Sequence, residues 1–110
     1  MTVVLHTLDQ AANRTQVVVA EGDALEVHLA ENPTTGYRWR MDGPGDDVIT
    51  FDASEFRQSG PAIGAGGLRV LRFVARRAGT AAIALTRSRL AGDAAPDAAD
   101  RFIVTVVVGS

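Results

Sequence analysis

Residues 24–39 read ALEVHLAENPTTGYRW, and they contain both the clearest strand pattern and the clearest turn pattern of the chain. The first seven of these residues alternate, with Leu25, Val27 and Leu29 on one face. An alternation of period two is typical of a half-buried strand in an antiparallel sheet. We therefore expect residues 24–30 to form a strand that packs one face on a hydrophobic core.

A turn-forming loop, residues 32–36, follows directly. Pro33 fixes its own φ and biases the preceding residue towards extended geometry, while Gly36 permits a positive φ or a close backbone approach. Tyr37 and Trp39 are the only Tyr and Trp of the chain, and their spacing puts them on one face of a strand over residues 37–41. This order predicts a displayed polar loop that is held by strands anchored in the core.

Further strand-like runs occupy much of the remaining chain. They are short β-rich or alternating segments that cover residues 2–8, 15–20, 48–53, 69–76, 80–87 and 102–108. A convincing 3.6-residue period is not found in any segment, so long helices are not expected. About seven or eight short strands with regularly spaced turns predict an all-β fold, an antiparallel β-sandwich that residues 1–110 form as a single domain.

Two long connections are rich in turn formers. Residues 54–67 end in a Gly-rich run and predict a long ordered loop, of a kind that is often functional, while residues 88–99 predict an exposed connection. Alternate loops of a sandwich lie at the same end, so loops 32–36, 64–67 and 88–99 are predicted to share one edge. Preorganised loops favour protein binding, although the pattern fits loops without a function equally well.

The composition excludes several classes of function. A net charge of −2 does not favour nucleic-acid or membrane binding, and the absence of cysteine excludes disulfides and thiolate chemistry. All 11 basic residues are arginine, which favours a GC-rich genome, and we expect a bacterial source. A signal peptide or membrane-spanning run is not visible, which predicts a cytoplasmic protein unless a leader has been removed.

The titratable residues do not form a pattern that is typical of an enzyme. His6 and His28 are the only histidines, and both are interpreted as surface or edge residues without a catalytic role. The acidic residues between positions 42 and 52 lack the spacing of a Ca²⁺ loop and are interpreted as solvated. A G-x-S-x-G motif is absent, and the Gly-rich run does not open a helix as a phosphate loop would. We expect no enzymatic activity, no metal and no cofactor.

Two motifs resemble the chagasin family of cysteine protease inhibitors. The first is the segment from Asn32 to Trp39, and the second is Gly64-Ala65-Gly66-Gly67 at the head of a strand. The similarity continues through residues 78–80, 85–86 and 101–104, and so covers nearly the whole chain from Gly22 onward. The resemblance implies an immunoglobulin-like sandwich whose three loops form a wedge in the active-site cleft of a papain-family cysteine protease.

The resemblance also implies which residues contact the protease. Thr34 would face the catalytic centre of the protease, with four neighbours shaping the loop: Asn32, Pro33, Thr35 and Gly36. The second contact would come from Gly64, Ala65, Gly66, Gly67 and Leu68, through backbone and apolar atoms. Inhibition would be reversible and steric, without a cofactor, and we expect the inhibitor to be monomeric.

The third motif departs from the family pattern. Where the family has Arg-Pro-Trp or a close aromatic variant, this chain has Arg89-Leu90-Ala91. A large aromatic residue is the usual anchor at such interfaces, and losing one from a hot spot costs about 2 kcal/mol or more. An alternative interpretation is therefore a β-sandwich that binds another protein and has lost protease inhibition together with this anchor.

Overall fold

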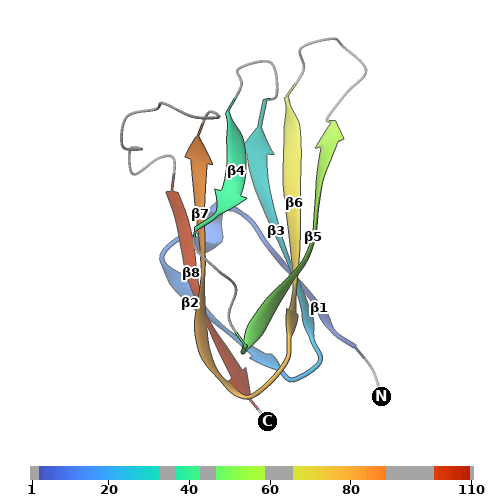
Figure 1. Cartoon of the computed structure of the whole chain (residues 1–110), viewed down its shortest axis with the longest axis vertical. Coiled ribbons are helices and arrows are strands. Elements are labelled where there is room, and N and C mark those ends of the chain that lie inside the picture. The colour runs from blue at the N-terminus through green and yellow to red at the C-terminus, as the bar shows by residue number, and fades with distance from the viewer. Residues whose placement is uncertain (1–2, 33–36, 43–46, 59–65, 89–100, 110) are drawn as a thin grey trace.

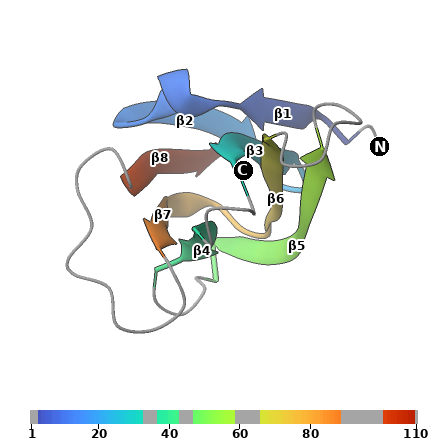
Figure 2. The ribbon, with the colours of Figure 1, turned by 90° about the horizontal axis from the view of Figure 1, so that it is seen from above.

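The computed structural model describes residues 3–32, 37–42, 47–58, 66–88 and 101–109. Eight strands in these ranges form two four-stranded sheets that lie face to face (Figure 1, Figure 2). In spatial order the first sheet contains β1 (Leu5–Leu8), β3 (Ala24–Glu31), β6 (Gly67–Ala75) and β5 (Ile49–Gln58). The second contains β2 (Thr15–Ala20), β8 (Arg101–Gly109), β7 (Gly79–Ser88) and β4 (Arg38–Met41). The predicted all-β sandwich is confirmed.

Two edge pairs are parallel, whereas the sequence predicted antiparallel sheets throughout. β1 runs parallel to β3, and β2 runs parallel to β8, while the other four strand pairs are antiparallel. The chain passes from β1 in one sheet through a short 3-10 helix, η1 (Gln10–Ala12), to β2 in the other sheet. Neither edge strand is joined to its partner by a tight hairpin, so the antiparallel direction that a hairpin imposes does not apply.

The core lies between the two sheets and follows the predicted alternation. Leu25, Val27 and Leu29 are each 0% exposed on β3. Their partners come from both sheets and form one hydrophobic cluster with them, which includes Leu71, Phe73, Ile83, Leu85, Phe102, Val104 and Val106. Within the described ranges, no helix is both long and apolar enough to cross a bilayer.

β5 is longer than the sequence predicted. Residues 54–58, which were expected to begin a long loop, continue the strand and pair with residues 67–71 of β6. β5 is the edge strand of its sheet, and most of its side chains are exposed on both faces. Because neither face is buried along this half of the strand, selection for apolar alternation is absent and the period-two signal is lost.

Two buried carboxylates lie away from the end of the sandwich where β3 leads into loop 32–36. Glu26 on β3 lies 3.0 Å from Nε2 of His28 and 3.3 Å from Nη1 of Arg72. The hydrogen bond from His28 lowers the pKa of Glu26, and burial opposes this shift. His28, interpreted from the sequence as solvent-facing, is therefore half-buried in an ion-paired group on the outer face of the first sheet.

The second carboxylate, Asp23, holds the turn that links β2 to β3. It accepts a 3.0 Å hydrogen bond from the backbone N–H of Ala20, which lowers its pKa, and its Oδ2 lies 2.9 Å from Nε2 of His6. Gly22 in this turn has φ of 88°, a conformation that favours glycine. His6 therefore has a structural contact that joins the edge strand β1 to this turn.

Candidate functional site

Six strand ends meet at one end of the sandwich. In the first sheet β3 ends at Glu31, opposite Gly67, and β5 ends at Gln58, also opposite Gly67. In the second sheet β4 begins at Arg38, opposite the last residue of β7, and β8 begins at Arg101, opposite Thr86, which lies two residues before the end of β7. These ends lie together at the top of Figure 1. The strands that flank the three predicted loops therefore share one edge, as expected.

The structure describes part of the predicted contact set. Asn32 directly follows β3, Gly66 directly precedes β6, and Gly67 and Leu68 are the first residues of β6. Leu68 is 37% exposed, so its side chain can contact a partner at this end of the sheet. The other members lie outside the described residues: Pro33, Thr34, Thr35, Gly36, Gly64, Ala65, Arg89, Leu90 and Ala91.

Glu31 occupies a core-facing position at the end of β3. It continues the series of Leu25, Val27 and Leu29, and its side chain is fully buried. Burying an ionised carboxylate is costly unless it is paired and hydrogen-bonded. The pairing comes from Arg69 on β6, whose Nη2 lies 2.8 Å from Oε1 of Glu31 and whose Nε lies within 3.2 Å of both carboxylate oxygens.

Glu31 also contacts the other sheet. The backbone N–H of Trp39 on β4 donates a 2.8 Å hydrogen bond to Oε2 of Glu31. The indole N–H of Trp39 donates a 2.9 Å hydrogen bond to the backbone carbonyl of Ala30. Trp39 is only 3% exposed, as predicted for an anchoring residue. The two strands that flank loop 32–36 are therefore joined by two hydrogen bonds across the sandwich.

Two arginines extend this group of contacts. Arg87, at the core-facing phase of β7, stacks over Trp39 with its Cζ 5.5 Å from the ring centroid. Arg69 lies over Phe56 of β5 at 5.9 Å and donates from Nη1 to the Ser54 hydroxyl at 3.2 Å. We call the four residues that close the core at this end the inter-sheet layer: Glu31, Trp39, Arg69 and Arg87. Its four residues lie on β3, β4, β6 and β7, so at least one strand beside each of the three loops contributes to the layer.

Sequence reasoning missed this layer, although a signal for it is present. In β3, β6 and β7 the apolar series on the core face ends in a charged residue at the loop end: Glu31, Arg69 and Arg87. A charge in phase with buried apolar residues must find a partner or reach water. One acid and two arginines at the same end of the sandwich indicate such pairing.

Two glycines of the Gly-rich motif, Gly66 and Gly67, lie in the described ranges and have different surroundings. A Cβ atom on Gly67 would lie 2.2 Å from the carbonyl oxygen of Arg57 and 2.7 Å from Cζ of Phe56, which is closer than such contacts permit. A Cβ on Gly66 would meet its nearest neighbour, the Glu31 carbonyl oxygen, at an ordinary 3.6 Å. Gly67 is therefore required for packing between β5 and β6, whereas Gly66 has room for a side chain.

A shallow hollow of about 200 Å³ lies between the flanking strands. Residues at the start of the first loop and at the end of the second line it together with one arginine: Ala30, Glu31, Asn32, Gly66, Gly67 and Arg87. The hollow is continuous with the inter-sheet layer, and its lining comes from β3, β6 and β7. This part of the edge is therefore concave and mixed in polarity, which suits contact with another protein surface.

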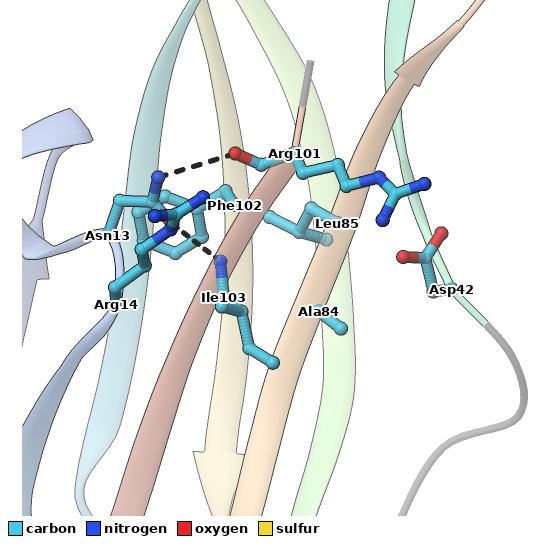
Figure 3. Close-up of a pocket in the computed structure, with 8 residues that line it drawn as sticks. All are labelled: Asn13, Arg14, Asp42, Ala84, Leu85, Arg101, Phe102 and Ile103. Atoms are coloured by element: carbon cyan, nitrogen blue, oxygen red, sulfur yellow. Dashed lines mark hydrogen bonds between the residues drawn. The ribbon is translucent and has the colours of Figure 1, made fainter. Parts of the chain in front are cut away.

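A second hollow, of about 290 Å³, lies beside β7 and β8 (Figure 3). Asn13 at its rim accepts a 2.9 Å hydrogen bond from the backbone N–H of Ile103 and donates to the Arg101 carbonyl at 3.4 Å. Figure 3 shows the Arg101 side chain extending away from Arg14 and towards Asp42. The two cations do not converge on one ligand position, so we interpret Asn13 as a brace for the first residues of β8.

The described residues do not provide a set of ligands for a metal ion. Groups of three or more His, Asp or Glu side chains that could hold a metal ion are not found in these ranges. Among the described residues, the edge presents the exposed Leu68 and the lining of the shallow hollow. These features fit a surface that binds a protein.

Comparison with known proteins gives a consistent picture. The model of the family described as chagasin family peptidase inhibitor I42 matches residues 18–106. Chagasin from Trypanosoma cruzi is 33% identical over 89 residues, which cover 76% of this chain and 81% of chagasin. Amoebiasin-1 from Entamoeba histolytica is 30% identical over 95 residues, 86% of this chain and 90% of its own.

A solved structure shares the fold. The crystal structure of the cysteine protease inhibitor EhICP2 from Entamoeba histolytica superposes with a TM-score of 0.83. The superposition covers 97% of each chain at 21% sequence identity. At this level of identity the likeness concerns the architecture of the two sheets.

Proposed function

The chain belongs to the chagasin family of peptidase inhibitors, and from this premise we propose that it is a reversible, steric inhibitor of papain-like cysteine proteases. One observation carries the proposal: the Asn32–Gly36 motif joins β3 to β4 at the edge where the strands flanking all three loops meet. A loop held at both ends in a fixed geometry loses less conformational entropy on docking. The protein acts as an inhibitor and not as an enzyme.

The proposed contacts follow the three loops. Thr34 would face the catalytic centre of the protease, within a loop shaped by Asn32, Pro33, Thr35 and Gly36. Gly64, Ala65, Gly66 and the exposed Leu68 would contact one wall of the cleft, while Gly67 keeps β6 close to β5. Arg89, Leu90 and Ala91 would make the third contact. The reactive thiol belongs to the protease, and the inhibitor acts as a monomer without a cofactor.

Titration of papain tests this proposal. Papain whose active sites have been counted is mixed with increasing amounts of the protein, and residual hydrolysis of a small substrate is measured. We expect competitive inhibition that reverses on dilution, and a protein that remains uncleaved after long incubation. Absence of inhibition at about micromolar concentration, against papain and several related enzymes, would overturn the proposal.

A second candidate function rests on the third motif, which departs from the family pattern. Arg89-Leu90-Ala91 lacks the aromatic residue that the family pattern has there. A chain that had exchanged its protease target for another protein would still form this sandwich and this edge. Capture of binding partners from lysate of the native host distinguishes the two candidates, because a cysteine protease is the dominant partner only under the first.

A further inference from the structure

Glu31 lies next to the first loop and contacts the strands that hold two loops. It directly precedes Asn32, its carboxylate accepts the Trp39 backbone N–H at 2.8 Å, and it pairs with Arg69 at 2.8 Å. Trp39 follows the first loop, and Arg69 lies two residues after Gly67, at the start of the strand that follows the second loop. One buried side chain therefore fixes both ends of the first loop and one end of the second.

From these contacts we infer that Glu31 is a positioning residue for protease inhibition, and this inference rests on the proposed function. Its carboxylate sets the separation of β3, β4 and β6 where the loops leave the two sheets. A change in this separation would be transmitted to both loops, since each is attached to a strand that Glu31 contacts. The side chain of Glu31 is itself fully buried, so its carboxylate would not touch the protease.

Glu31 makes a hydrogen-bonded connection between the two sheets that the Trp39 indole does not make. The two hydrogen bonds described above between β3 and β4 both involve Trp39 and the end of β3. The Trp39 indole N–H bonds to the backbone of Ala30 on β3, so it does not extend the connection to β6. Glu31 joins β4 to β6, because it bonds to both Trp39 and Arg69.

The chain provides a matched control on the same strand. Glu26 is also a buried carboxylate of β3 and also pairs with an arginine of β6, Arg72. It lies five residues before Glu31, about 16 Å away along the strand. Its side chain occupies the outer phase of β3, and its hydrogen bonds to His28 and Arg72 stay within the first sheet. Removing its charge tests the general effect of losing a buried ion pair.

The test compares Glu31→Gln, Glu26→Gln and Arg69→Met in the full chain. Inhibition of papain is measured at a temperature where circular dichroism shows every variant fully folded. We expect Glu31→Gln and Arg69→Met each to weaken inhibition at least tenfold, which is about 1.4 kcal/mol of binding free energy, and Glu26→Gln to leave inhibition unchanged. The double variant Glu31→Gln/Arg69→Met should inhibit papain no less strongly than the less inhibitory of the two single variants. Both substitutions break the same interaction between Glu31 and Arg69, so their effects should not add.

Amide hydrogen exchange gives a second readout that does not need a protease. Glu31→Gln should accelerate exchange at Asn32, Gly66 and Trp39, and Glu26→Gln should leave exchange at these amides unchanged. If the native chain does not inhibit any protease but this exchange pattern is found, the proposed function fails while the positioning role of Glu31 stands. If folded Glu31→Gln inhibits as strongly as the native chain, or its exchange matches that of Glu26→Gln, the inference is overturned.

Discussion

Oε2 of Glu31 accepts a 2.8 Å hydrogen bond from the backbone N–H of Trp39, which links the last residue of β3 to a strand of the opposite sheet. The residues between them include the motif Asn32–Gly36 that defines the family resemblance. The hydrogen bond thus closes the base of this loop. Arg69, on the other side of the same carboxylate, extends the closure to the strand that follows the second loop.

Replacing Gly67 by alanine should destabilise the fold, whereas replacing Gly66 should not. The new Cβ at position 67 would lie 2.2 Å from the Arg57 carbonyl oxygen, so β5 must move away from β6. Overpacking of this kind costs about 1–3 kcal/mol of unfolding free energy. Urea denaturation of Gly67→Ala and Gly66→Ala measures the difference. Equal midpoints for the two variants would show that β5 adjusts without cost.

Stability should fall in acid because two carboxylates have a lowered pKa in the folded state. Asp23 and Glu26 have ordinary pKa values of 3.8 and 4.5, and in the fold both are lowered, by the Ala20 backbone N–H and by His28 respectively. The unfolded chain therefore binds more protons in this pH range. The stabilisation is complete above the ordinary values and is lost as the pH falls through the folded values.

Asp23→Asn provides the measurement for this pH dependence. Urea denaturation of the native chain and the variant is followed from about pH 2.5 to pH 7. We expect the variant to be less stable at neutral pH and to lose less stability on acidification, because one of the two shifted groups has been removed. Parallel curves for the two proteins would contradict the assignment to Asp23.

Asn13→Ala should loosen the start of β8 with a small effect on global stability. The side chain bonds the backbone at Arg101 and Ile103, and both bonds are exposed. A hydrogen bond of this type contributes about 1 kcal/mol. Amide exchange should accelerate at Ile103, and the mid-strand amide of Val106 serves as the control. If the Ile103 amide keeps its native exchange rate, Asn13 is not the brace of this strand.

Restoring the aromatic anchor of the third loop should tighten inhibition. The change Ala91→Trp, combined with Leu90→Pro, reinstates the family pattern after Arg89. A buried aromatic hot spot contributes about 2 kcal/mol, which is roughly a thirtyfold lower inhibition constant. Competitive inhibition of papain by the native chain and the double variant gives the ratio. An unchanged inhibition constant would place residues 89–91 outside the interface.

The alternation of Leu25, Val27 and Leu29 was sufficient to predict β3, and β-rich or alternating runs located the other seven strands, although the second half of β5 was missed. The extension of β5 could not be predicted because residues 54–58 form an edge strand and bury neither face. The parallel pairing of β1 with β3 and of β2 with β8 was also missed. A single sequence carries no signal for the direction of strands that are not joined by a hairpin.

At the candidate site, the turn-forming residues and the resemblance to the family identified the loops. They did not identify the contacts that hold these loops in place. Glu31 follows three buried residues in phase, and its charge could have been read as a sign of a buried partner. Its partner Arg69 is distant in the sequence, and only the pairing of β3 with β6 brings the two together. The surroundings of Gly67 likewise depend on the extended β5, which the sequence did not predict.

The most direct test of inhibition is titration of papain with the native chain and with Thr34→Arg. The arginine would place a large charged side chain where Thr34 is proposed to face the catalytic centre. We expect the native chain to inhibit competitively and reversibly, and Thr34→Arg to abolish inhibition while its unfolding midpoint stays unchanged. Equal inhibition by the two proteins, or none by the native chain at about micromolar concentration, would contradict the account.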